Sequence, residues 1–119
     1  MEKKEKIAVI DIESGLERFI GNKKLYCEYL EKFLFDGSYG EFCAAVAMDN
    51  IVMADEALHT LIGTSANLSL GRLHNVASEA ALNLKKTDSP EIVQAIVDMV
   101  TEAYTEACKA VRDYLESAK

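Results

Sequence analysis

Apolar side chains recur every three or four residues along most of this sequence, and that period constrains the fold more than any other feature. One such stripe runs from Leu25 to Leu34 and another from Ile92 to Leu115. Residues with this spacing share one face of an α-helix. No stretch alternates apolar and polar residues for long enough to predict a half-buried strand, and proline occurs once, at Pro90. The sequence therefore predicts an all-α fold.

Capping and helix-breaking residues divide the first half of the chain into short helices. Asp11 is expected to cap the first of them and Gly21 to end it. Asn22 starts the next helix, which ends near residues 36–37. The apolar face of the first helix comprises Ile12, Leu16, Phe19 and Ile20.

Longer elements follow. Ser38 and Glu41 have the spacing of a capping box and predict a short helix that breaks at residues 48–50. A helix is then expected from about Ile51 to Asn67, and Ser69 is expected to cap the element after it.

The last helix is predicted to be the longest. Ser89 caps it, Pro90 lies in its first turn, and its apolar spacing continues to near the C-terminus, a span of ~40 Å at 1.5 Å per residue. A helix of this kind cannot bury its stripe alone. We therefore expect an up-and-down antiparallel four-helix bundle with one or two additional short helices, folded as a single domain over residues 1–119 and monomeric.

Charge and composition narrow the class of protein. Lys and Arg total 13 against 20 Asp and Glu, a formal net charge of -7 that disfavours nucleic acid as a partner. The longest apolar run near the start, Ile7 to Ile10, is shorter than the ~20 residues of a membrane span or the roughly 7 to 15 of a signal-peptide core. We expect a cytoplasmic protein without a membrane segment. Met1 and the charged opening favour a chain that stands alone in the cell, and a piece of a larger hybrid kinase is the alternative. The cysteines are Cys27, Cys43 and Cys108. They lie too far apart in the sequence for a zinc site, and we expect them to be reduced.

His59 is the residue most in need of a chemical explanation. Helical geometry directs Leu58 and Leu61 into the core and His59 toward solvent. Gly63, one turn later, costs the helix roughly 1 kcal/mol relative to alanine. Because helical side chains lean toward the N-terminus, a bulky residue at position 63 would cover the imidazole, so glycine leaves a ring nitrogen open to a large reactant. The same face is predicted to carry Val52, Asp55, Glu56, Ile62, Gly63 and Ala66.

A plainer interpretation of His59 stays open, namely a surface histidine followed by a tolerated glycine. The other histidine, His74, lies beside the inward stripe of its helix and has no glycine one turn after it. We expect it to be a surface or boundary residue.

The segment from Leu58 to Leu73, LHTLIGTSANLSLGRL, resembles the signature of the histidine-containing phosphotransfer (HPt) domain family. In that family a helix carries His-x-Leu-Lys-Gly and small residues, followed by a turn and a new helix. Upstream, GLERFIGNKKLYCEYLEKF from Gly15 to Phe33 is similar to the opening helices of the family, so the resemblance covers nearly the whole chain.

The resemblance implies a phosphorelay. His59 would accept a phosphoryl group from an aspartyl phosphate on one receiver domain and pass it to another. The implied partners are response-regulator receiver domains and hybrid histidine kinases. The receiver would supply the Mg²⁺ and an acidic pocket, so the chain itself would need no metal or cofactor and would be a phosphocarrier, not an enzyme. A neutral imidazole nitrogen is a suitable nucleophile for this step.

Three positions depart from the family pattern. Ile62 replaces the usual lysine, Ser69 replaces the glycine expected in the turn, and Ala81 replaces a glutamate often found on the following helix. Because Asp55 and Glu56 repel phosphoryl oxygens, we expect the missing lysine to slow transfer several-fold, since an exposed charge pair contributes about 0.2 to 1 kcal/mol.

The substitution at position 62 also has a docking interpretation. Ile62, Val52 and Ala66 would form a small exposed apolar patch against which a receiver packs, unless the N-terminal segment at residues 7–10 covers part of it. Two other functions remain open. One is a degenerate protein of the same fold that binds a receiver or kinase without carrying phosphate, and the other is a helical adaptor unrelated to phosphorelay.

Overall fold

The computed structural model describes residues 7–118, and over that range the chain forms helices and no strand. The all-α prediction is confirmed. The helices are α1 (Ile12–Arg18), α2 (Lys23–Leu34), α3 (Ser38–Ala47), α4 (Ile51–Asn67), α5 (Gly71–Leu84) and α6 (Pro90–Ser117).

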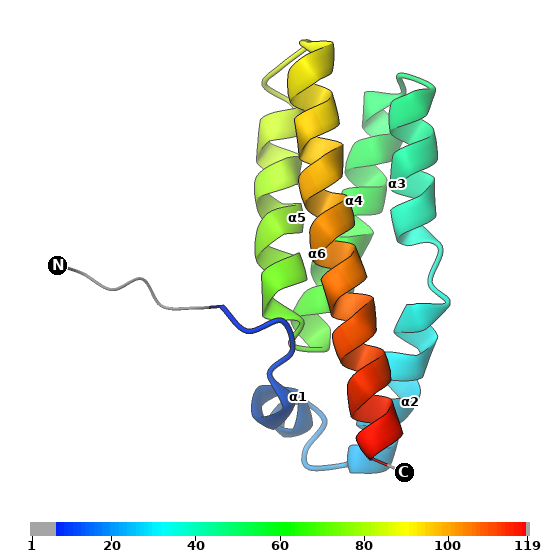
Figure 1. Cartoon of the computed structure of the whole chain (residues 1–119), viewed down its shortest axis with the longest axis vertical. Coiled ribbons are helices and arrows are strands. Elements are labelled where there is room, and N and C mark those ends of the chain that lie inside the picture. Colours follow the sequence, from blue (N-terminus) through cyan, green and yellow to red (C-terminus); the bar gives the residue numbers. More distant parts are fainter. Residues whose placement is uncertain (1–6, 119) are drawn as a thin grey trace, which may run out of the picture.

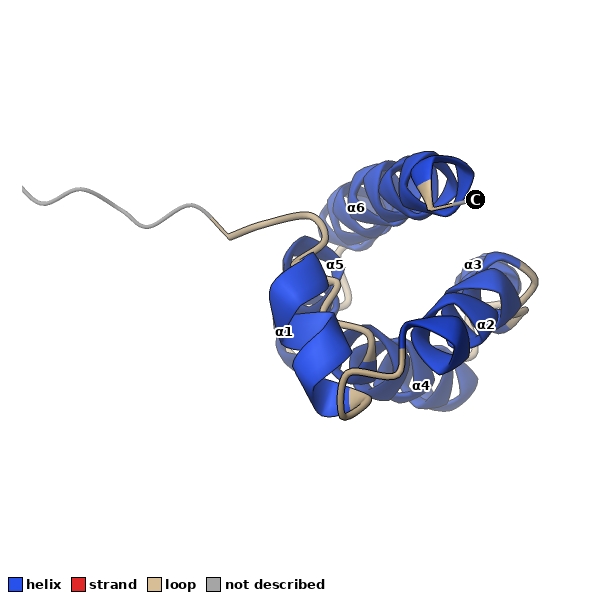
Figure 2. Ribbon diagram, turned by 90° about the horizontal axis from the view of Figure 1, so that it is seen from below, coloured by secondary structure: helices blue, strands red, loops and turns tan. Residues whose placement is uncertain are grey.

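The long helices run side by side and enclose the core (Figure 1). α4 packs against α3 and α5, α5 packs against α6, and α6 packs against α2. Figures 1 and 2 show α2 and α3 following one another end to end along the same side of the molecule, while α1 lies across one end. The largest fully buried side chains between these helices include Tyr26, Phe33, Phe42 and Leu58.

Side-chain caps set most helix starts where the sequence predicts them. Asp11 accepts a hydrogen bond from the backbone N–H of Ser14, and Asn22 accepts one from Leu25. Ser89 caps α6 through the N–H of Ile92. Each cap satisfies a backbone donor that the first turn of a helix leaves without a partner.

Two predicted caps are wrong. α3 starts at Ser38 itself, and the N–H of Ser38 donates to Asp36 at 2.7 Å, so Ser38 and Glu41 form no capping box. α5 starts at Gly71 after Leu70, and Ser69 does not cap it. Ser69 has a φ of 59°, in the left-handed region that favours glycine. The serine therefore occupies a turn conformation in which glycine would be unstrained.

Ile20 departs from the prediction that it belongs to the apolar face of the first helix. α1 ends at Arg18, and Ile20 adopts a φ of 55° with its side chain 92% exposed. Gly21 follows with a φ of 72°, and its N–H donates to the carbonyl of Leu16. The chain reverses here through two left-handed residues, which turns the side chain of Ile20 away from the core.

Hydrogen bonds join the N-terminal part of the chain to the turn between α4 and α5. The N–H of Asp11 donates to the carbonyl of Ser69 at 3.0 Å, and the N–H of Arg72 donates to the carbonyl of Ala8 at 3.1 Å. The Tyr26 hydroxyl donates to the carbonyl of Leu68 at 2.9 Å. These bonds hold α1 and α2 against the C-terminal end of α4.

Within residues 7–118, no helix combines the length and apolar character that crossing a membrane requires. The three cysteines are free thiols; Cys108 is buried, while Cys27 and Cys43 are half-buried.

Candidate functional site

His59 lies in the middle of α4 on the side that faces away from the core. Its side chain is 58% exposed, whereas Leu61 is 2% exposed. Both predictions about these two residues are confirmed. Leu58 and Ala57 are buried beside it, so the helix that carries the imidazole is fixed by packing on its opposite face.

Gly63 leaves open space one turn beyond His59. A Cβ added at Gly63 would meet no atom within 4 Å apart from its own helix and neighbours. Packing inside this chain therefore gives no reason for glycine at this position, although glycine weakens the helix. The open space is consistent with access to the imidazole from outside.

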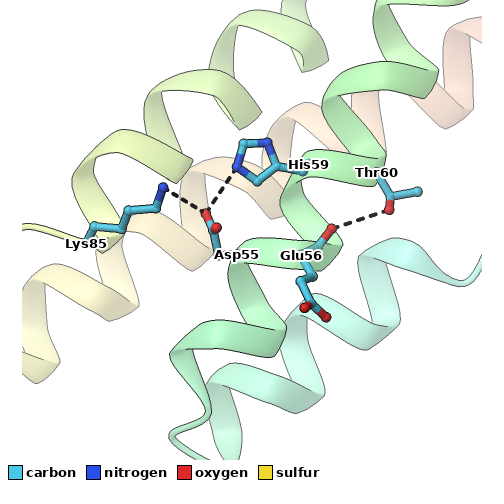
Figure 3. A network of polar contacts seen from close by, with 5 residues as sticks. All are labelled: Asp55, Glu56, His59, Thr60 and Lys85. Atoms are coloured by element: carbon cyan, nitrogen blue, oxygen red, sulfur yellow. Dashed lines mark hydrogen bonds and ion pairs between the residues drawn. The ribbon is translucent and has the colours of Figure 1, made fainter.

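A carboxylate and an ammonium group lie beside the imidazole (Figure 3). Asp55 Oδ1 is 3.4 Å from His59 Nε2 and 3.6 Å from Lys85 Nζ. Lys85 is the C-cap residue of α5, so its side chain reaches across from a neighbouring helix. The Asp55 carboxylate, which is expected to repel a phosphoryl group, is therefore paired with the positive charge of Lys85.

Two polar neighbours on α4 do not take part in that contact. Glu56 is exposed, and its backbone carbonyl accepts a hydrogen bond from the Thr60 hydroxyl at 3.3 Å. In Figure 3 the Glu56 carboxylate points away from His59. Of the two acidic residues one turn before His59, Asp55 is therefore the one that touches the ring.

The apolar residues predicted to surround His59 differ in exposure. Val52 is 69% exposed, but Ile62 is half-buried and packs against the core, and Ala66 is half-buried. The N-terminal segment at residues 7–10 leaves Val52 uncovered and lies at the start of α5, where Ile7 approaches Gly71.

A surface groove with a volume of about 580 Å³ runs along another side of α4. His59 and Gly63 line it, together with Ala66, whereas Val52, Asp55, Glu56 and Ile62 do not. The opposite wall includes Arg18 from α1 and Tyr29 and Lys32 from α2. Lys32 Nζ lies 4.8 Å from the centre of the Tyr29 ring, a cation–π distance that holds the ammonium group at the groove.

Three cations near α4, namely Arg18, Lys32 and Lys85, were not predicted from the sequence. Arg18 and Lys32 lie between Gly15 and Phe33, and no spacing rule connects them to His59. Lys85 lies in a polar stretch at the end of a predicted helix, where a lysine is unremarkable. The three come close to α4 only because the helices pack against it.

His74 is half-buried and lines a smaller groove with Asp11 and Ser14, away from His59. Among the described residues, no three His, Cys, Asp or Glu side chains lie close enough together to hold a metal ion. The chemistry available at His59 is that of an exposed imidazole nucleophile with a carboxylate on one side and an open groove on another.

Comparison with protein-family models, with curated proteins and with solved structures finds no match to this chain.

Proposed function

We propose that this chain is a phosphocarrier in a phosphorelay, a single histidine phosphotransfer domain in which His59 receives and donates the phosphoryl group. The observation that carries the proposal is the exposed imidazole of His59 next to Gly63, where an added Cβ would meet no atom within 4 Å. A transfer between two proteins requires that the reacting phosphorus reach the ring nitrogen in line with its lone pair. An open space beside the ring meets that requirement.

The proposal extends to the fold. We infer a four-helix bundle in which α4, α5 and α6 are three of the rods and α2 with α3 together forms the fourth, since α2 and α3 follow one another end to end. α1 would be the additional short helix. In this arrangement His59 lies on the outer face of α4, where a partner domain can dock.

The proposed partners are response-regulator receiver domains and hybrid histidine kinases, each of which would bring its own Mg²⁺ and acidic pocket. Arg18 and Lys32 on the wall of the groove support this choice. The chain has a net charge of -7, whereas the charged residues that line the groove are the two cations and one carboxylate, Asp36, so the groove is less acidic than the rest of the protein. An acidic docking face is attracted to such a region and oriented by it. In this proposal the chain is a cytoplasmic monomer.

A second function is favoured by one observation. Ile62, where the family has a lysine, packs against the core and carries no charge toward the imidazole. A protein of the same fold that binds a receiver or kinase without accepting phosphate would tolerate this substitution.

One experiment separates the two functions. The full chain and its His59→Gln variant are each incubated with Mg²⁺ and with receiver domains from the same cell that carry a labelled phosphoryl group. Binding of the receiver and transfer of the label are measured separately. The phosphocarrier proposal predicts that both proteins bind but that only the unsubstituted chain gains label. Tight binding without label on either protein, for every receiver tried, would favour the non-phosphorylating binder.

A further inference from the structure

A second groove, smaller than the one at His59, lies between α1 and the turn that joins α4 to α5. Its volume is about 250 Å³, and its polar lining residues are Asp11, Ser14, Arg18, Ser65, Ser69 and His74. Pockets that take drug-sized ligands range from about 300 to 1,000 Å³, so this groove fits a smaller molecule. Arg18 and Ala66 line both grooves, which therefore adjoin.

Two side chains in the smaller groove carry hydrogen-bond donors that no protein group uses. Within residues 7–118, neither the Arg18 guanidinium nor the His74 imidazole takes part in an ion pair or a side-chain hydrogen bond. The two lysines near His59 differ in this respect, because Lys85 pairs with Asp55 and Lys32 lies over the ring of Tyr29. Arg18 therefore keeps all of its side-chain N–H groups available for a ligand.

The hydroxyl groups of Ser14 and Ser69 meet in the same groove, with their Oγ atoms 3.0 Å apart. One hydroxyl donates to the other, so the hydroxyl that accepts keeps its own proton for a further acceptor. The Ser65 hydroxyl does not contribute, because it is buried and donates to the carbonyl of Leu61 at 2.6 Å. The free donors of the groove therefore come from a guanidinium, an imidazole and one hydroxyl.

Donors of this kind suit an oxyanion, because phosphate and carboxylate oxygens accept hydrogen bonds and a guanidinium binds two such oxygens side by side. We propose that Arg18, His74 and the Ser14–Ser69 hydroxyl pair form a binding site for a small oxyanion. Asp11 also lines the groove, and its Oδ1 atom already accepts the N–H of Ser14 at 3.1 Å. The charge of Asp11 opposes an anion, so the site favours a small ligand with little negative charge.

Arg18 connects this site to the groove at His59. A bound oxyanion neutralises the charge of Arg18, which otherwise attracts an acidic receiver to the neighbouring groove. The anion and the receiver then compete for one guanidinium, and each weakens the binding of the other by the same factor. This consequence rests on the proposed function, whereas the anion site itself does not.

The first test titrates the full chain, labelled with ¹⁵N, with sodium phosphate and separately with sodium acetate, at constant pH and ionic strength. We expect saturable shifts at the amides of Ser14 and Ser69, at the ring of His74 and at Nε–H of Arg18. Sodium chloride at the same ionic strength should produce none of them. Saturation by phosphate alone would assign the site to phosphate groups, and saturation by both anions would assign it to phosphate and carboxylate groups alike.

Two variants and a matched control locate the binding energy. Arg18→Ala should weaken phosphate binding about tenfold or more, the size of a lost hydrogen bond to a charged group. Lys24→Ala should leave it unchanged, because Lys24 is an exposed cation that lines neither groove. Asp11→Asn should tighten binding a few-fold, since asparagine caps a helix as well as aspartate does but carries no charge.

Three outcomes of this titration would overturn the inference. The first is the absence of saturation with either anion in the unsubstituted chain. The second is an equal loss of affinity in Lys24→Ala and Arg18→Ala, which would assign the binding to overall charge. The third is weaker binding in Asp11→Asn, which would mean that the ligand needs the carboxylate.

Association with a receiver gives a second readout. Saturating phosphate should slow association of the unsubstituted chain several-fold relative to sodium chloride at equal ionic strength, and should have no such effect on Arg18→Ala. An equal slowing of both proteins would place the phosphate effect on the receiver and overturn the competition. Saturable binding that depends on Arg18, in a chain that no receiver binds, would leave the anion site standing and refute the phosphorelay proposal instead.

Discussion

Gly15 in α1 lies so close to Tyr26 in α2 that a Cβ added to the glycine would overlap the phenol ring. The Tyr26 side chain is fully buried, and its hydroxyl donates to the carbonyl of Leu68 at the end of α4. The ring cannot move aside without losing that hydrogen bond. Glycine at position 15 therefore allows α1 to pack over the end of the molecule.

Gly15→Ala should destabilise the protein by about 1–3 kcal/mol, the usual cost of inserting an atom into a packed core. Gly63→Ala is the matched comparison, because an added Cβ there meets nothing, and it should stabilise the protein by roughly 0.5–1 kcal/mol through better helix propensity. Urea unfolding of the two variants measures both changes. Equal effects of the same sign would show that the contact with Tyr26 does not govern position 15.

A larger side chain at position 63 should block transfer to His59 without unfolding the protein. Gly63→Leu places a branched side chain over the imidazole, whereas Gly40→Leu adds the same group to α3 at another helical glycine with open space above it. Label transfer from a receiver should fall at least tenfold in the first variant and stay near the unsubstituted rate in the second, a difference of ~1.4 kcal/mol or more in barrier height. Normal transfer in Gly63→Leu would mean that the glycine does not serve access.

Alkaline pH should weaken the fold through two tyrosines. Burial raises the pKa of Tyr26 and of Tyr104 from 10.0 to about 12. The folded state therefore keeps protons that the unfolded state releases near pH 10, so this contribution to stability is complete below pH 10 and is lost as the pH rises through 12. Tyr104→Phe should lose less free energy of unfolding between pH 9 and pH 11 than the unsubstituted protein, as measured with urea at each pH. An identical loss in both proteins would assign the alkaline sensitivity to other groups.

The cations of the groove should control the rate at which a receiver associates. Reversing both charges with Arg18→Glu and Lys32→Glu should slow association several-fold at low salt, and the difference should shrink as salt screens the field. Stopped-flow association at two salt concentrations measures this effect. Lys24→Glu is the control for the lysine, because Lys24 is exposed on the same helix but does not line the groove. If Lys24→Glu slows association as much as Lys32→Glu does, net charge and not the groove determines the rate.

Structural features that depend on residues close together in the sequence were predictable, whereas those that depend on distant residues were not. The span of α4 and the caps at Asp11, Asn22 and Ser89 were predictable, since a cap and a helical stripe depend on residues within a few positions of one another. The exposure of His59 was predictable for the same reason.

Left-handed residues and contacts between helices were harder to predict. The spacing of Ile20 predicts a place on the apolar face of the first helix, yet the chain leaves the helix at Arg18 and turns through a positive φ that β-branched residues rarely adopt. The pairing of Lys85 with Asp55 joins residues 30 positions apart, and the groove cations Lys32 and Arg18 lie 27 and 41 positions before His59. Such pairs depend on how the helices pack, which single-sequence patterns do not encode.

The most direct test of the central claim is to locate the phosphoryl group after transfer from a labelled receiver. The unsubstituted chain and His74→Gln should both acquire acid-labile, alkali-stable label, and His59→Gln should acquire none while keeping its helical circular dichroism spectrum, because His59 alone of the two histidines stands beside an open glycine. Label that persists in His59→Gln, or that disappears in His74→Gln instead, would contradict the account.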